Sequence, residues 1–207
     1  MKSVYSLVLS DEVVAACDKE AYRKGVSRST LINEILAERL SFVTPKKRME
    51  DIFSQMEQRM RATELRLLSR ANTAMDFAAA LNYRYNPTVR YGVALYDGGE
   101  DVGEVRVSLR TQNAALIAHV TAFFKLFDEL DRSFLPVRST IEMGRYVRVI
   151  PMPQVPANRT EEDVAGGAII SFINRFNALL SVYFDALSLG KNPETAVIKA
   201  YQNPTKS

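Results

Sequence analysis

The stretch that decides the expected fold is Ser3-Val4-Tyr5-Ser6-Leu7-Val8-Leu9, close to the N-terminal end of the chain. Its side chains alternate with a period of two, as in a half-buried strand. One face carries Tyr5, Leu7 and Leu9, and the other carries Val4, Ser6 and Val8. A lone strand leaves its backbone N–H and C=O groups without partners, so this segment requires a second strand.

Two helical segments follow the predicted strand. Ser10 precedes the acidic pair Asp11 and Glu12, which is an N-cap signature, and Gly25 is typical of the residue that ends a helix. The apolar positions of this first helix are Val13, Val14, Cys17, Ala21 and Tyr22. Ser27 then opens a second helix, whose apolar positions are Leu31, Ile32, Ile35, Leu36 and Leu40.

This order of elements, joined by Gly25-Val26-Ser27-Arg28-Ser29, resembles the ribbon-helix-helix family of DNA-binding proteins, which includes the Arc and MetJ repressors and CopG-like proteins. The resemblance implies that two chains pair their strands into an antiparallel ribbon, so that the folded unit is an obligate dimer. It also implies that the outward ribbon residues enter the major groove of double-stranded DNA; these are Lys2, Val4, Ser6 and Val8. The start of the second helix, with Ser27, Arg28 and Ser29, would bind a DNA phosphate.

The outward ribbon face departs from the usual pattern of the family, which places polar or basic residues there. Val4 and Val8 can contact a thymine methyl group but cannot read a guanine or adenine edge by paired hydrogen bonds. Three explanations stay open. Lys2, Ser6 and the helix residues carry recognition, or the readout depends on DNA shape, or the module serves mainly for dimerisation.

Composition is that of a soluble globular protein of one or two domains, with 207 residues, 47% hydrophobic and 25% charged. The formal net charge is +3, and residues 1–48 hold nine Lys and Arg residues against six Asp and Glu residues. The whole excess of positive charge therefore lies in the segment that the resemblance assigns to DNA. With one cysteine, no signal-peptide pattern and no long uncharged apolar run, we expect a cytoplasmic protein without a membrane span.

Residues 49–85 contain no Pro or Gly, and their apolar and small side chains recur every three or four residues. This spacing predicts one long helix over residues 45–86. Because the N-terminal module is expected to be a dimer, the helix is interpreted as a dimeric coiled-coil neck or, alternatively, as a helix packed on its own C-terminal domain. The repeating positions are Met49, Ile52, Met56, Met60, Thr63, Leu67, Ala71, Ala74, Ala78 and Leu81.

The remainder, residues 87–207, predicts an α+β domain of unknown role with a small antiparallel sheet and long apolar helices. Strands are expected over 88–96, 104–110 and 137–150, and helices over 111–134, 160–189 and 192–201. The acidic loop between the first two strands is interpreted as a turn rather than a cation site. Arg138, Arg145 and Arg148 fit either an anionic pocket or, preferably, the solvent face of an edge strand.

The sequence shows no nucleotide-binding loop, no metal-ligand cluster and no nucleophile with a partner base, and His119 is its only histidine. We therefore expect neither an enzyme nor a cofactor or metal site. The leading hypothesis is a homodimeric transcriptional regulator whose C-terminal domain serves sensing, higher oligomerisation or docking of a protein partner. Two alternatives are an accessory DNA-binding protein for plasmid transfer or partition, and an assembly protein that uses the N-terminal module only to dimerise.

Overall fold

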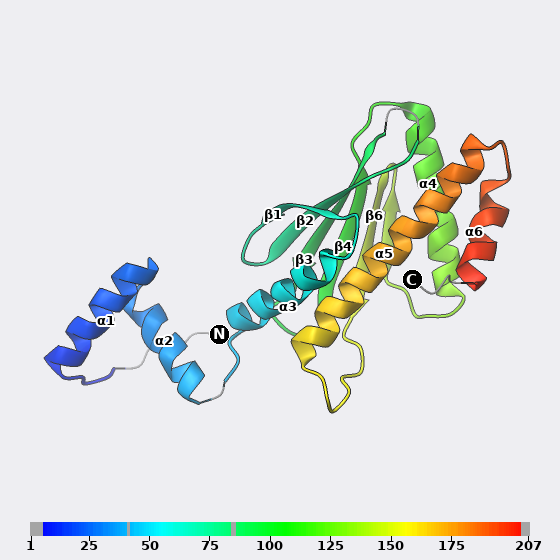
Figure 1. The fold of residues 1–207 in the computed structure, drawn as a ribbon. Coiled ribbons are helices and arrows are strands. Elements are labelled where there is room, and N and C mark those ends of the chain that lie inside the picture. Colours follow the sequence, from blue (N-terminus) through cyan, green and yellow to red (C-terminus); the bar gives the residue numbers. More distant parts are fainter. Residues whose placement is uncertain (1–5, 41, 84–85, 204–207) are drawn as a thin grey trace. The chain divides into compact units, whose positions relative to one another are not determined.

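The computed structural model describes residues 6–40, 42–83 and 86–203. The chain forms two compact units, residues 1–47 and residues 48–207, and each is described by itself. Together they are an α+β protein, with six helices and a six-stranded antiparallel sheet among the described residues (Figure 1).

The N-terminal unit contains two helices that match the predicted positions, α1 (Asp11–Lys24) and α2 (Arg28–Arg39). Gly25 ends α1 in the left-handed conformation with φ 64°, and the Ser27 side chain caps α2. Residues 6–10 form neither helix nor strand in this single chain, where no second strand is present to pair with them. The first half of the predicted strand lies outside the described residues.

The C-terminal unit is built on one sheet in the order β1-β2-β3-β4-β6-β5, with every neighbouring pair antiparallel. β1 to β4 form a meander in which each strand pairs with the next. After β4 the chain forms α4 and β5, and β6 then pairs with both β4 and β5. The strands are β1 (Arg66–Arg70), β2 (Ala74–Ala80), β3 (Thr88–Leu95), β4 (Asp101–Leu109), β5 (Ser139–Glu142) and β6 (Arg145–Pro151).

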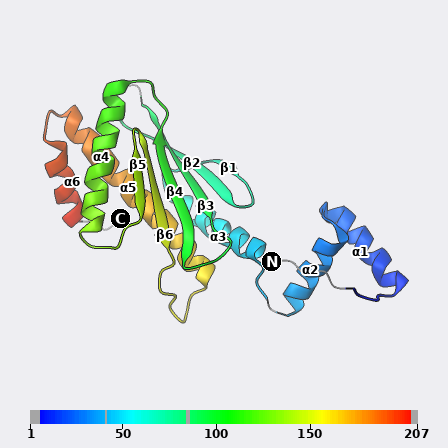
Figure 2. The same ribbon diagram turned by 180° about the vertical axis from the view of Figure 1, so that it is seen from behind.

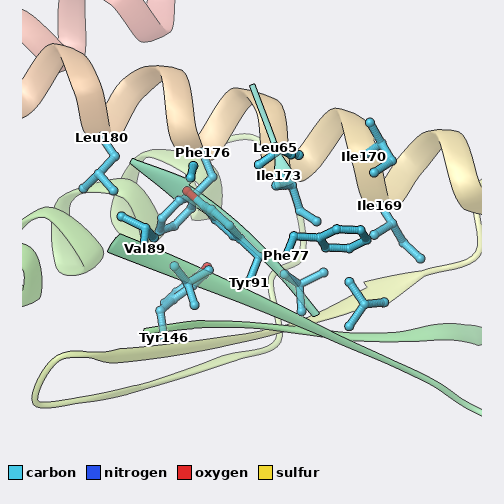
Figure 3. Packing of buried hydrophobic residues seen from close by; sticks show 14 of the residues in the cluster. Leu65, Phe77, Val89, Tyr91, Tyr146, Ile169, Ile170, Ile173, Phe176 and Leu180 are labelled. Atoms are coloured by element: carbon cyan, nitrogen blue, oxygen red, sulfur yellow. The ribbon is translucent and has the colours of Figure 1, made fainter. Parts of the chain in front are cut away.

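Helices cover one face of this sheet (Figure 1). They are α3 (Pro45–Met60), which belongs to this unit from Arg48 onward, α4 (Ala114–Arg132), α5 (Glu161–Ser188) and α6 (Pro193–Gln202). Alternate strand residues such as Phe77, Tyr91 and Tyr146 point from the sheet toward Ile173 and Phe176 of α5 (Figure 3). One apolar core therefore lies between the sheet and the helices.

The predicted long helix over residues 45–86 is wrong beyond Met60. The chain leaves α3 there and forms β1 and β2, because Met75, Phe77 and Ala79 alternate into the core at a period of two. Ala74 and Ala78, which were predicted to lie on the apolar face of a helix, therefore lie in β2. Pairing of β2 with β3 outweighs the helix propensity of these alanines.

The coiled-coil neck is also wrong for the described part of this segment. The apolar face of α3 is buried in the core of the C-terminal unit, where Ile52 is 1% exposed and Met56 is 0% exposed. Gly166 of α5 lies so close to α3 that an added Cβ would be 3.0 Å from the Ile52 carbonyl oxygen. α3 is therefore a helix packed on its own C-terminal domain, as the alternative interpretation held.

The predicted strand over residues 137–150 is two strands, β5 and β6, joined by a turn at Gly144 with φ 71°. The edge-strand interpretation is wrong for Arg148, because β6 lies between β4 and β5 and the Arg148 side chain points into the core side of the sheet. Its guanidinium pairs with buried Asp131 of α4. Arg138 and Arg145, by contrast, are exposed and pair with Asp101 and Glu142.

α5 is the one described helix that is long and apolar enough to cross a membrane by length and composition. In this structure twelve of its residues are buried, several of them against the sheet (Figure 3). Its apolar surface is thus used in the core of the C-terminal unit.

Candidate nucleic-acid interface

The N-terminal unit buries very little of its apolar surface. Among its described residues only Ala21, Leu31 and Ala37 are buried apolar side chains. Ten large apolar side chains are exposed: Leu7, Val8, Leu9, Val13, Tyr22, Ile35, Leu36, Leu40, Phe42 and Val43. A unit of this size cannot form a stable core from three side chains.

Four of these ten side chains line one groove of about 630 Å³ along α2: Leu7, Val8, Leu9 and Leu36. Leu7 and Leu9 contribute from the N-terminal segment, and Val14, Ile32 and Leu36 contribute from the two helices. The exposed fraction of Leu7 is 62% and that of Leu36 is 49%. Leu7, Leu9 and Leu36, which were predicted to face the core of a dimer, are therefore uncovered in this single chain, as is Val8, which was predicted to face outward.

The start of α2 gathers hydroxyl groups at the positive end of the helix. The Ser27 Oγ accepts a hydrogen bond from the Thr30 backbone N–H at 3.2 Å. The same Oγ lies 3.0 Å from the Ser29 Oγ and 2.9 Å from the Thr30 Oγ1. The first turn of α2 contains no acidic residue. Free backbone N–H groups, hydroxyl donors and the helix dipole together suit an anion such as a phosphate.

Arg28 differs from its predicted role as a freely available phosphate ligand. Its Nε and Nη2 donate to the two carboxylate oxygens of Asp18, each at 2.5 Å, in a bidentate pair that joins α2 to α1. Hydrogen bonding from Arg28 lowers the pKa of the Asp18 carboxyl, and the same bond raises the pKa of Arg28. A phosphate at this helix start would have to compete with Asp18 for the guanidinium.

The structure brings part of the predicted interface together. Val8, Arg28 and Ser29 line the same groove, and Val8 is fully exposed. Ser6 is exposed as well. Lys2 and Val4 lie outside the described residues. Asp18 was missed by the sequence reasoning, because it lies ten residues before Arg28 and only the turn between α1 and α2 brings the two together.

A polar network inside the C-terminal unit was also missed. Asp131 on α4 is 1% exposed and receives hydrogen bonds from Arg148 of β6 and, at 2.7 Å, from the Tyr201 hydroxyl of α6. The Arg175 guanidinium of α5 lies 3.4 Å from the same carboxylate and 4.2 Å from the Tyr201 ring centroid. These contacts join β6, α5 and α6 to one buried carboxylate on α4, which is a structural role.

A second carboxylate of α4, Asp128, is held in a similar way. It accepts hydrogen bonds from Ser139, from Arg132 at 2.6 Å and from the Tyr146 hydroxyl at 3.1 Å. Burial opposes ionisation of Asp128, but these three donors together lower the pKa of its carboxyl. Asp128 is therefore a satisfied carboxylate rather than a free general base.

Two further features of the C-terminal unit bear on chemistry. A pocket of about 500 Å³ lies where α4 begins, and it is lined by Tyr83, Thr111, Asn113 and His119 among others. Within the described part of the chain, no group of three or more His, Cys, Asp or Glu side chains is placed to hold a metal ion.

Comparison with known proteins found no matching family model, no matching curated protein and no matching solved structure.

Proposed function

We propose that the chain is a dimeric DNA-binding protein in which the N-terminal units of two copies form a ribbon-helix-helix module. The observation that carries this proposal is the imbalance of the N-terminal unit, which has three buried apolar side chains and ten exposed ones. A second copy that pairs with the N-terminal segment as a strand would cover Leu7, Leu9 and Leu36 and leave Val8, Arg28 and Ser29, which line the same groove in the single chain, for DNA. It would thereby supply the missing strand partner for the N-terminal segment.

DNA is the proposed ligand because the groups that the resemblance assigns to it lie on the N-terminal unit. The resemblance assigns Lys2, Val4, Ser6 and Val8 to the outward face of the ribbon. The phosphate site is the start of α2, with backbone N–H groups and the hydroxyls of Ser27 and Ser29. The net positive charge of residues 1–48 favours a polyanion there.

Transcriptional regulation is the role we propose first, with plasmid transfer or partition as a related role for the same module. An assembly protein is a separate candidate, in which the N-terminal unit only dimerises. The exposed and apolar Val8 favours this candidate, because an outward valine offers no hydrogen bond to a base edge.

One experiment separates these roles: the full chain is titrated against a random DNA library at several salt concentrations, and the bound fraction is sequenced. Steep salt dependence with an enriched palindrome is expected for a dimeric sequence-specific regulator or origin binder. Binding without enrichment would indicate an architectural or accessory role. Absence of binding at low salt would contradict the DNA proposal and leave the assembly role.

A further inference from the structure

The sheet of the C-terminal unit has a second face that no described helix of this unit covers. In Figure 2 the strands lie in front of α3 and α5 and turn this face toward the viewer. Strand residues alternate between the two faces, so Arg90, between buried Val89 and Tyr91, lies on the open one. We call this surface the open face.

One row of register partners crosses the open face through all six strands. Starting from β1, the row is Arg66, Ala78, Arg90, Ser108, Arg145 and Glu142. Neighbouring strands are about 4.8 Å apart, so Arg66, Arg90 and Arg145 originate at intervals of about 10 Å, with a small residue between each pair. Ala78 is only 4% exposed although it lies on this face, as expected if arginine stems lie over it.

Arg66, Arg90 and Arg145, which we call the arginine row, have few oppositely charged partners among the described residues. All three arginines are exposed, and neither Arg66 nor Arg90 forms an ion pair with a described residue. Arg145 has Glu142 at 3.9 Å, but the Glu142 side chain is 71% exposed. An exposed pair at this distance contributes little.

The neighbouring rows differ, because their charged groups have partners. Arg106 pairs with Glu104, Arg138 pairs with Asp101, and the Asp76 carboxylate accepts a hydrogen bond from Ser69 at 2.8 Å. The unpaired positive charge of the open face is therefore concentrated in the arginine row.

We propose that the arginine row is a second DNA contact, in which Arg66, Arg90 and Arg145 bind phosphates of the duplex backbone. This inference rests on the proposed DNA-binding function and assigns a role to the C-terminal unit. A row of flexible guanidinium groups separated by small side chains suits a regular array of phosphates and gives no base specificity. A second copy stacked on the same face is disfavoured, because it would place arginine rows against each other over a surface whose paired strand residues are mostly small or polar, with Val147 and Val149 as its larger apolar side chains.

The test is the salt dependence of DNA binding by the full chain carrying Arg66→Gln, Arg90→Gln and Arg145→Gln together. Each lost phosphate contact reduces the magnitude of the slope of log affinity against log salt by about 0.9. The slope of the triple variant should therefore be shallower by about 2.7. The matched control is Lys125→Gln, Lys191→Gln and Lys199→Gln, which removes the same charge from exposed sites on α4, on α6 and in the turn before α6 and should leave the slope nearly unchanged. A triple Arg→Lys variant should keep most of the slope, which guards against a folding artefact.

The outcomes separate this inference from the proposed function. DNA binding by the unmodified chain with no slope change in the Arg→Gln variant would overturn the second contact and leave the N-terminal module intact. Equal slope losses in the Arg→Gln and Lys→Gln variants would also overturn it, as an effect of net charge alone. A smaller oligomer in the Arg→Gln variant would assign the open face to a second copy. No DNA binding by the unmodified chain would overturn both proposals.

Discussion

The two units of the molecule differ in how they complete a core. In the C-terminal unit, 35 buried apolar residues among those described form one cluster between the sheet and its helices. In the N-terminal unit, three apolar side chains of the two helices are buried, and ten large apolar side chains of the helices and their flanking segments are exposed. The contrast indicates that the C-terminal unit can be stable within one chain, whereas the N-terminal unit requires a partner.

The largest expected effect concerns the partner of the N-terminal unit. Leu7→Asp places a charge on the face that we expect the second copy to cover, so the dimer should be lost while the C-terminal unit stays folded. Molar mass by light scattering over a range of concentrations measures this, together with circular dichroism. The matched control is Val8→Asp, one residue along and on the predicted outward face of the ribbon, which should remain a dimer if the segment pairs as a strand. A Leu7→Asp variant with the mass of a dimer would contradict the ribbon model.

A smaller but still large effect is expected in the core of the C-terminal unit. The Phe176 ring lies 4.7 Å from the Phe127 ring, 5.3 Å from Phe123 and 5.6 Å from Tyr146, and is fully buried. Phe176→Ala should lower the free energy of unfolding of this unit by about 3–5 kcal/mol. Urea denaturation measures the loss, which should not depend on protein concentration.

The control for the core variant is Phe134→Ala, since that ring is 69% exposed and stacks only on Tyr201 among the described aromatic residues. Phe134→Ala should lower the free energy of unfolding much less than Phe176→Ala does. Similar losses for both variants, or a loss that changes with protein concentration, would contradict a self-sufficient C-terminal core.

Local sequence signals predicted the elements whose boundaries are set by local chemistry. Thr160 with the acidic turn after it predicted the start of α5, and the Thr160 side chain does cap that helix. Gly25 and Ser27 likewise predicted the end of α1 and the start of α2. Caps and helix-ending glycines depend on residues within a few positions, so they can be identified from the sequence.

Features that depend on distant residues could not be predicted in this way. The segment from 66 to 80 has the composition of a helix, and only pairing of β2 with β3 makes it a strand. Arg148 was expected to face solvent, because its partner Asp131 lies seventeen residues earlier on another element. The arginine row has the same origin, since its members come from three strands that only the sheet register aligns.

The smallest expected effect tests how Arg28 is used at the start of α2. Arg28→Ala should weaken binding to all DNA sequences and lower the salt slope by about one, as for one lost phosphate contact. Asp18→Asn removes the carboxylate that now holds the guanidinium, so it should strengthen binding at low salt and leave the slope intact or steeper. Both variants break the same link between α1 and α2. Equal weakening by both would therefore show that Arg28 only joins the two helices, whereas opposite effects would show that Asp18 and DNA compete for it.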